Sequence, residues 1–210
     1  MIAVVDYHKG NLKSVERGLA GVGGDACITD DAATVARADA IVLPGVGAFA
    51  DAMQSLDELG LSDVLRERIA AGVPFLGICL GLHLLYEAGE EGAAPGGTVA
   101  GLGVLPGVVG ALPKTDVAGA VYKIPHVGWN SVEFVRTSPL FDGIAEGEYF
   151  YFTHSFAAPR SDADVALTAH SVAFPSAVQL GDTVFGVQFH PEKSSDAGAH
   201  LLANFIKIIS

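Results

Sequence analysis

A cysteine between two glycines, Cys79, stands where an apolar run passes directly into a second, helix-like run. Residues 73–78 are typical of a buried strand, and a helix is expected over 80–87. The layout G-x-C-x-G between strand and helix is typical of a nucleophile elbow, where flanking side chains would collide in the tight turn. A thiol at a helix N-terminus meets the positive end of the helix dipole, which favours thiolate. A lone cysteine is more often structural, but the two glycines favour a nucleophile.

A cysteine nucleophile needs a base, and a histidine near the end of the chain is the candidate. His190 follows an apolar, strand-like run over 183–189, and Pro191 fixes a rigid turn directly after it. Glu192 can return to hydrogen-bond the imidazole, set its tautomer and stabilise the imidazolium. A histidine in such a turn is by itself more often a surface residue. Together with Cys79, however, the pattern predicts a Cys-His-Glu triad.

The two motifs, Gly77-Ile-Cys-Leu-Gly81 and Phe185-Gly-Val-Gln-Phe-His-Pro-Glu192, resemble those of class I (triad) glutamine amidotransferases. Further runs narrow the resemblance to the glutaminase subunits of imidazole glycerol phosphate synthase, and they span essentially the whole chain in the order expected for that family. These runs are Asp6-Tyr7 with Gly10-Asn11-Leu12, Leu43-Pro-Gly-Val-Gly-Ala-Phe49, Pro125-His-Val-Gly-Trp-Asn130, Tyr149-Phe-Tyr-Phe152 with His154-Ser155, and His190-Pro-Glu-Lys-Ser194.

The resemblance implies an activity and a set of site residues. The protein would hydrolyse L-glutamine to glutamate and ammonia. It would deliver the ammonia, within a heterodimer, to a (β/α)8 cyclase subunit that makes imidazole glycerol phosphate in histidine biosynthesis. Backbone N–H groups near Val46 or Gly47, with that of Leu80, would stabilise the oxyanion of the tetrahedral intermediate. The implied substrate contacts are His83, Glu91, Ser155 and Phe156, and the implied partner-facing residues around the ammonia exit are Asn11, Trp129 and Lys193.

Two positions depart from the family pattern. The family elbow usually continues to a Gln that binds the substrate, and His83 stands in that place, one helical turn after Cys79 and on the same face. A neutral imidazole can donate or accept one hydrogen bond but lacks the bidentate amide. We therefore expect His83 to be a tolerated substitution that keeps one polar contact. His8 replaces a common Gly, so its loop is expected to differ, with little effect on the chemistry.

Three of the assigned segments have simpler alternatives. The run Pro44 to Gly47 is, by itself, more often an ordinary turn. Glu90 and Glu91 form an acidic pair that a solvated turn would equally explain. Trp129 would equally be a core aromatic, although the residues on either side of it favour an exposed turn. The sequence leaves these alternatives open.

The elements that must position these residues alternate in the first half of the chain. Strands are expected over 2–6, 40–43 and 75–78, with helices over 12–22 and 61–71, and a loop over 89–103. Short β-like segments then dominate, at 104, 121–124, 131–134, 150–152, 165–169, 177–179 and 184–189, before a helix over 197–209. Early βα alternation followed by many short strands predicts an α/β fold. We expect a three-layer, open, mostly parallel sheet with helices on both faces and an antiparallel β extension.

Length, composition and charge bound the remaining possibilities. A chain of 210 residues, 50% of them hydrophobic, suits a single domain over 1–210 with a sizeable core. The net charge of −12, with no basic run, argues against nucleic acid as a partner. No apolar stretch approaches the ~20 residues of a membrane span, and no signal peptide is indicated, so no membrane partner is expected. Metal-ligand spacing is absent, and we expect neither metal nor cofactor.

The second cysteine, Cys27, has no neighbouring histidine or acidic orienter in sequence and is interpreted as structural. A single reactive thiol suits the reducing cytosol, so a cytoplasmic protein is expected. Two alternative functions remain open. The first is the glutaminase of another triad system, such as the anthranilate, guanylate or pyridoxal phosphate systems, against which the runs 125–130 and 193–194 weigh. The second is a non-catalytic interaction module, against which the intact Cys79, His190 and Glu192 weigh.

Overall fold

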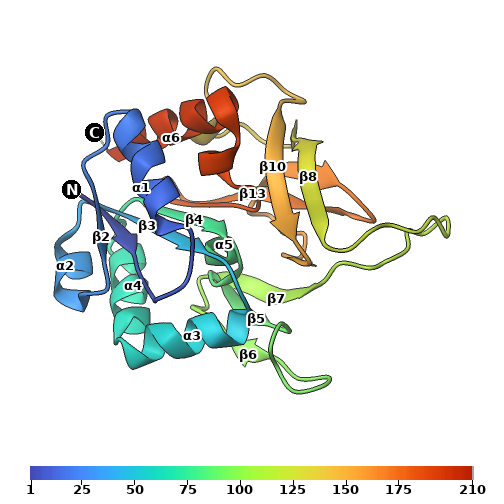
Figure 1. Cartoon of the computed structure of the whole chain (residues 1–210), viewed down its shortest axis with the longest axis horizontal. Coiled ribbons are helices and arrows are strands. Elements are labelled where there is room, and N and C mark those ends of the chain that lie inside the picture. The colour runs from blue at the N-terminus through green and yellow to red at the C-terminus, as the bar shows by residue number, and fades with distance from the viewer. Residues whose placement is uncertain (210) are drawn as a thin grey trace.

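An eight-stranded sheet forms the centre of the computed structural model, which describes residues 1–209 (Figure 1). The strand order is β2-β1-β3-β4-β14-β13-β12-β9. The first five strands run parallel: β2 (Ala26–Thr29), β1 (Ile2–Val5), β3 (Ala40–Gly45), β4 (Phe75–Cys79) and β14 (Val184–Val187). The last three extend the sheet antiparallel: β13 (Ala173–Leu180), β12 (Asp164–Ala169) and β9 (Glu133–Phe134). Every residue of β1, β3, β4 and β14 is buried, as expected of parallel strands covered on both faces.

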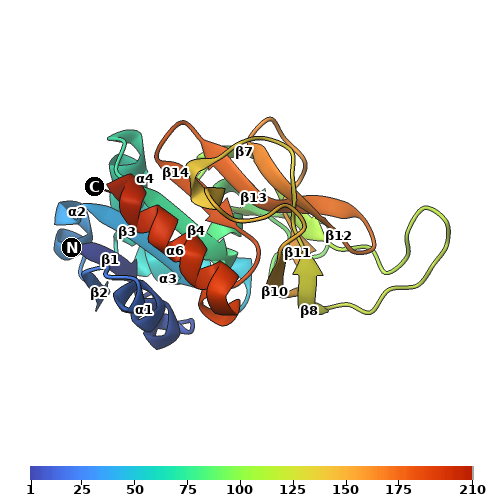
Figure 2. The ribbon, with the colours of Figure 1, turned by 90° about the horizontal axis from the view of Figure 1, so that it is seen from above.

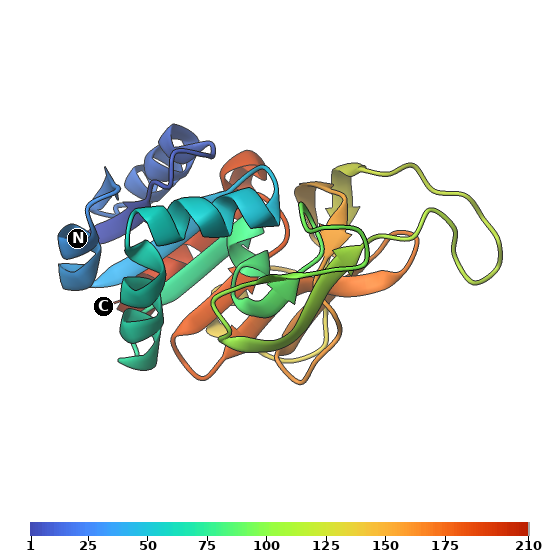
Figure 3. The ribbon, with the colours of Figure 1, turned by 90° about the horizontal axis from the view of Figure 1, so that it is seen from below.

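Helices cover both faces of this sheet (Figures 2 and 3). One face carries α1 (Leu12–Gly21) and α6 (Ser195–Ile209), whose Leu19, Leu202 and Phe205 belong to one hydrophobic core. The other face carries α2 (Ala32–Arg37), α3 (Phe49–Glu58) and α4 (Leu61–Ala70), which pack over a second core. The predicted three-layer α/β fold with an antiparallel extension is confirmed. No helix within residues 1–209 has the length and apolar character to span a membrane.

Two small sheets lie beyond the end of β4 (Figure 1). One pairs β8 (His126–Ser131) with β10 (Tyr149–His154), antiparallel. The other has the order β11-β7-β5-β6 and consists of β11 (Phe156–Ala157), β7 (Leu105–Ala111), β5 (Tyr86–Gly89) and β6 (Val99–Ala100). Strands β10 and β11 follow each other directly, so Ser155 between them joins the two small sheets.

The helix expected after Cys79 over 80–87 is wrong in its length. Helix α5 (Leu80–His83) is a single turn, and β5 begins at Tyr86. All residues from Leu80 to Tyr86 are buried, so the run has no polar face that would separate a helix from a strand. Pairing of β5 with β6 and β7 ends the helix, which is a tertiary effect.

Three elements within the first 60 residues were not predicted: β2, α2 and α3. Helix α3 has a clear signal, because Phe49, Ala52, Met53 and Leu56 form one buried face with helical spacing. Edge strand β2, with the sequence Ala-Cys-Ile-Thr, is only partly buried, and its apolar run is too short to predict a strand by itself. The strand expected over 121–124 is also wrong, since Val121 forms only an isolated bridge to Thr115 in an exposed loop. The loop expected over 89–103 contains the short strand β6.

Candidate active site

Cys79 closes β4 in a backbone conformation that residues with a side chain rarely adopt. Its φ is 53° and its ψ is −105°. A Cβ on Gly77 would lie 2.5 Å from the carbonyl oxygen of Gly81, and a Cβ on Gly81 would collide with the carbonyl oxygen of Leu43. The expectation that both glycines are sterically required is confirmed. The turn holds the thiol at the carboxyl end of the central strands.

His190 and Glu192 form a buried pair directly after β14. His190 Nδ1 lies 2.9 Å from Glu192 Oε1, and the two side chains are 3% and 1% exposed. Burial lowers the pKa of His190, but the Cys79 thiol and the Glu192 carboxylate outweigh it and raise this pKa to about 9. His190 Nε2 is buried and has no hydrogen-bond partner among the described residues. Of the two ring nitrogens, Nδ1 is thus engaged by Glu192, and Nε2 is the one left without such a bond.

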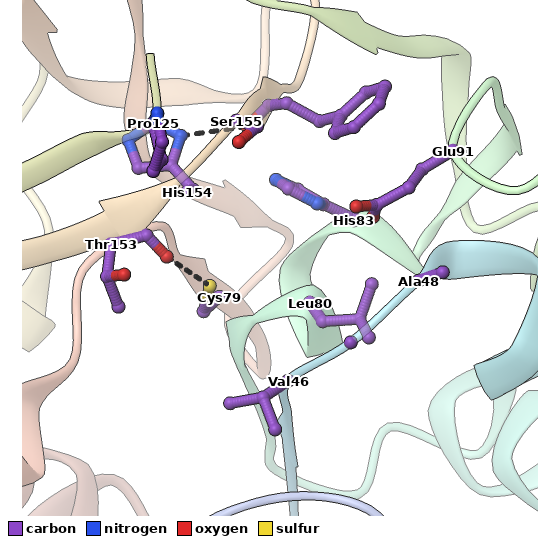
Figure 4. A pocket seen from close by; sticks show the side chains of 12 residues that line it. Val46, Ala48, Cys79, Leu80, His83, Glu91, Pro125, Thr153, His154 and Ser155 are labelled. Carbon is purple, nitrogen blue, oxygen red and sulfur yellow. Dashed lines mark hydrogen bonds between the residues drawn. The ribbon is translucent and has the colours of Figure 1, made fainter. Parts of the chain in front are cut away.

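A cavity of about 460 Å³ opens beside Cys79 (Figure 4). It brings together residues from the turn after β3, the elbow, the loop after β5 and the end of β10. Its lining residues are Val46, Gly47, Ala48, Cys79, Leu80, His83, Glu91, Pro125, Thr153, His154, Ser155 and Phe156. The cavity thus collects the nucleophile candidate with every residue expected to form the oxyanion and substrate sites.

The turn after β3 runs beside the elbow because Gly45 and Cys79 are register partners of neighbouring parallel strands. Val46 is exposed, and Gly47 has a φ of +101°, which a glycine adopts without strain. Leu80, the first residue of α5, faces the same cavity. Backbone donors of the turn and of the elbow therefore border one space.

Glu91 is not part of a freely solvated acidic turn. Its Oε2 accepts a hydrogen bond of 3.3 Å from the backbone N–H of Phe49, the first residue of α3, and burial raises its pKa. Glu90 turns elsewhere, and its carboxylate accepts a 3.2 Å bond from the N–H of Ala111. Glu91 thus satisfies an N-terminal donor of α3 while its side chain borders the cavity (Figure 4).

His83 is buried, with 3% of its surface exposed, although it borders the cavity. Its Nε2 lies 2.7 Å from Oε1 of Gln188, a residue with no exposed surface. Burial lowers the pKa of His83 to about 4, so the ring is neutral near pH 7. The polar contact that His83 makes in the structure is therefore with Gln188, inside the protein.

A chain of hydrogen-bonded side chains that starts at the cavity residue His154 was not predicted. His154 Nδ1 donates a 2.8 Å bond to the carbonyl of Phe156, and its Nε2 accepts a 3.0 Å bond from His126 Nδ1. Asn130 Nδ2 lies 3.2 Å from His126 Nε2. Burial lowers the pKa of His126 to about 4 and that of His154 to about 3, so both rings are neutral. We call His154, His126 and Asn130 the histidine chain.

Only an indirect signal for the histidine chain is present in the sequence. His126 and His154 are 28 residues apart but face each other as register partners of β8 and β10. Only that pairing brings the rings together. The other cavity residues not predicted as contacts are Ala48, Pro125, Thr153 and His154. Ala48, Pro125 and His154 belong to runs that carried the resemblance, and Thr153 lies between two such runs.

Trp129, Lys193 and Asn11 lie away from the cavity. Trp129 is 51% exposed on β8, so it is neither in a turn nor in the core. Its ring meets Tyr151 edge-on at 6.2 Å, and the Lys193 ammonium lies 5.9 Å from the centre of the Tyr151 ring. Asn11 precedes α1, which packs against the segment Pro191–Lys193. We call the surface of Trp129, Tyr151 and Lys193 the Trp129 face.

The second cysteine, interpreted from the sequence as structural, belongs to neither hydrophobic core. Cys27 is exposed on the edge strand β2, and its thiol contacts only the carbonyl of Ile28, at 3.6 Å. Because β2 is an edge strand that pairs only with β1, this thiol is accessible to solvent. Over residues 1–209, no group of three or more His, Cys, Asp or Glu side chains is arranged to hold a metal ion.

The chain combines an open α/β sheet, a strained cysteine elbow and a buried His-Glu pair. The family model "Glutamine amidotransferase class-I" matches residues 3–209, and the chain belongs to this family. It is 47% identical over 99% of its length to the imidazole glycerol phosphate synthase subunit HisH of Moorella thermoacetica, covering 95% of that protein. It is 45% identical over its full length to the protein of the same name from Methanothermobacter thermautotrophicus, covering 99% of it.

Solved structures agree on the fold. A crystal structure described as a glutamine amidotransferase superposes with a TM-score of 0.73 at 19% identity, over 100% of this chain and 99% of the other. The structure of PurLQS from Thermotoga maritima gives a TM-score of 0.67 at 17% identity, over 99% and 96% of the two chains. At these identities the likeness concerns the fold alone.

Proposed function

We propose that this chain is the glutaminase subunit of an imidazole glycerol phosphate synthase, acting in the cytoplasm in histidine biosynthesis. The observation that carries the proposal is the strained Cys79 elbow, which borders the cavity, together with the buried His190–Glu192 pair, whose histidine has its pKa raised by the Cys79 thiol and the Glu192 carboxylate. Relatives of 42–47% identity, all named as HisH subunits of that synthase, support this system over the other triad amidotransferases.

In the proposed reaction the Cys79 thiol gives its proton to His190, and the sulfur attacks the carboxamide carbon of L-glutamine. Backbone N–H groups of Val46 or Gly47 and of Leu80 stabilise the oxyanion. The C–N bond breaks as His190 gives its proton to the leaving nitrogen, so ammonia departs and a glutamyl thioester remains. His190 then takes a proton from water, the hydroxide attacks the thioester carbon, and glutamate and the thiol are released. Glu192 orients His190 and stabilises its charged form, in line with the raised pKa of that ring.

The cavity supports a small polar substrate with a charged end. Its wall combines the Glu91 carboxylate with the segment of Ser155 and Phe156, and His83 closes one side. We propose that Glu91 binds the α-amino group of glutamine and that the Ser155–Phe156 segment holds its α-carboxylate. The shape and the opposite chemistry of the two walls then orient the side-chain amide toward Cys79.

Ammonia has to reach a synthase site without becoming protonated in bulk water, which calls for a docked partner. We propose a heterodimer with a (β/α)8 cyclase subunit that covers the Trp129 face and Asn11. An exposed tryptophan beside a tyrosine and a lysine suits such an interface, because aromatic residues are enriched in interface cores. The relatives' names, which describe subunits, support an assembly of this kind.

The proposal is tested by Cys79→Ala in the complex with a cyclase partner. We expect glutamine hydrolysis to vanish, while the synthase reaction supplied with free ammonia continues, because the cyclase does not need the thiol. Circular dichroism and co-purification with the partner control for folding and assembly. Glutamine hydrolysis by Cys79→Ala at the wild-type rate would exclude the covalent mechanism.

A further inference from the structure

A side-chain amide stands between His83 and the nucleophile. Gln188 follows β14 and has no exposed surface. Its Oε1 lies 2.7 Å from His83 Nε2, and its Nε2 lies 3.7 Å from the Cys79 sulfur. The three side chains come from α5, from the segment after β14 and from the elbow. They form a continuous buried line that ends on a reacting atom.

The proton on His83 Nε2 determines the orientation of the Gln188 amide. An amide oxygen can only accept, so His83 Nε2 carries the proton when Oε1 faces it. With His83 in this tautomer, a reversed amide would set its NH2 group against the His83 N–H, so the NH2 group is directed instead at the sulfur, 3.7 Å away. In the reverse orientation a carbonyl oxygen would face the sulfur, which disfavours negative charge on it. The donor on His83 therefore selects the orientation that suits a thiolate.

We propose that His83 is a positioning residue that holds the Gln188 amide so that its N–H stabilises the Cys79 thiolate. The inference rests on the proposed function, since it assumes that Cys79 is the nucleophile. It gives His83 a role other than that of a tolerated substitution in the glutamine pocket. Gln188 touches the reacting atom, whereas His83 acts only through Gln188.

The other neighbours of the Cys79 sulfur show why the Gln188 N–H matters for negative charge on it. The carbonyl of Thr153, 3.9 Å away, presents a partial negative charge to the sulfur. Tyr7, from the segment after β1, is buried, and its pKa is raised by burial and by the charge of Cys79. His190, backed by Glu192, is the cationic neighbour, and His154, which lines the same cavity, is neutral. Among the described residues, Gln188 is the uncharged side chain that donates a hydrogen bond to sulfur.

The test is the pH dependence of Cys79 alkylation by iodoacetamide, measured on the full chain with Cys27→Ser to remove the exposed second thiol. In this background we compare His83→Leu, which removes the donor, with His83→Gln, whose amide again offers an N–H at a similar reach. Gln188→Glu is the second probe, because it keeps the side-chain volume but places oxygen against the sulfur. His200→Leu, on the exposed surface of α6, is the matched control.

We expect His83→Leu to move the alkylation midpoint up by about one pH unit, which is tenfold less thiolate below the midpoint. Gln188→Glu should move it further, while His83→Gln and His200→Leu should stay within about 0.3 unit of the parent. Thermal melts verify that each variant is folded. An unchanged midpoint in folded His83→Leu and Gln188→Glu would overturn the proposal. A rise in KM without a shift in the midpoint would do the same, because it would make His83 a substrate contact only.

The outcome is separable from that of the proposed function. If Cys79→Ala still hydrolysed glutamine, the nucleophile would be wrong and the role of His83 would fall with it. If Cys79→Ala were inactive but the alkylation profiles were unchanged, only the positioning role of His83 would be wrong.

Discussion

The two sides of the cavity are held by different physical means. On the elbow side, backbone atoms of α5, β3 and β4 approach so closely that Gly77 and Gly81 have no room for a side chain. On the opposite side, the segment of Ser155 and Phe156 is held by hydrogen bonds of the histidine chain. The elbow therefore depends on steric contacts, and the far wall depends on polar side chains that must stay neutral and paired.

This difference predicts how each side responds to substitutions. Protein interiors are close-packed, so an added methyl group between backbone atoms has no place to go, and the elbow should fail abruptly. A hydrogen-bond chain loses one contact at a time, and each buried group left without a partner costs a limited free energy. The far wall should therefore weaken in steps that kinetics and pH can resolve.

Gly81→Ala should give the largest effect. The new Cβ would collide with the backbone carbonyl of Leu43, which cannot move aside as a flexible side chain could. We expect the free energy of unfolding to fall by about 4 kcal/mol or more and glutamine hydrolysis to be lost. Urea unfolding followed by circular dichroism measures the first quantity.

The matched control is Gly21→Ala at the end of α1. An added Cβ there has no atom within 4 Å, and the residue is exposed. This variant should be neutral or up to about 1 kcal/mol more stable, because alanine loses less backbone entropy in a helix. A Gly81→Ala protein as stable as Gly21→Ala would contradict the steric account of the elbow.

The same contrast explains what the sequence could predict. Steric demands act over short spacings in the sequence. Gly77 and Gly81 therefore predict the elbow, and continuous apolar runs predict the buried parallel strands. The fold prediction was confirmed. The histidine chain depends on the register of β8 with β10, which nothing in the local pattern specifies. The length of α5 failed for a related reason, since pairing of β5 with β7, and not local propensity, decides where that helix ends.

His126→Phe should give an intermediate effect on the far wall. It leaves the buried Nε2 of His154 without a donor, which should lower the free energy of unfolding by about 1–3 kcal/mol. A looser Phe156 carbonyl should raise KM for glutamine about tenfold with kcat within about threefold, the pattern of a lost binding contact. The control is His170→Phe, which can retain ring packing against His126 but is outside the chain. A loss of kcat above about 100-fold would instead place the chain in the chemistry.

The pH dependence of stability should sharpen the comparison further. His83, His126 and His154 have pKa values lowered to about 4, 4 and 3 from 6.5, so the unfolded chain binds protons that the folded chain does not between pH 6.5 and about 4. Stability therefore falls as pH falls through that window, by up to about 1.4 kcal/mol per pH unit for each histidine. His190 acts oppositely. With its pKa raised to about 9, its contribution is present below pH 6.5 and is lost as pH rises toward 9.

Urea unfolding at pH 6.5, 5.8 and 5.0 measures this slope. His126→Phe removes one of the three low-pKa rings, so its slope should be smaller than that of the wild type by up to about 1.4 kcal/mol per pH unit. His200→Leu, which removes an exposed histidine, should retain the wild-type slope. Equal slopes in His126→Phe and the wild type would mean that His126 is not held neutral in the fold.

Trp129→Ala should have the smallest effect on stability, because it touches neither the elbow nor the far wall. The side chain is 51% exposed and its ring contact is one edge-on approach to Tyr151, so the free energy of unfolding should change by about 0.5 kcal/mol or less. If the Trp129 face binds the cyclase, the variant should nevertheless lose much of the partner-dependent stimulation of glutamine hydrolysis. The measurement is hydrolysis with and without the partner and its nucleotide substrate, beside thermal melts, with exposed Val117→Ala as the control.

Since free ammonia production would waste glutamine, the lone wild-type subunit should be nearly inactive, and full activity without the partner would contradict this coupling. A stable Trp129→Ala protein with undiminished stimulation would place the interface elsewhere, and it would leave the comparison of elbow and far wall untouched.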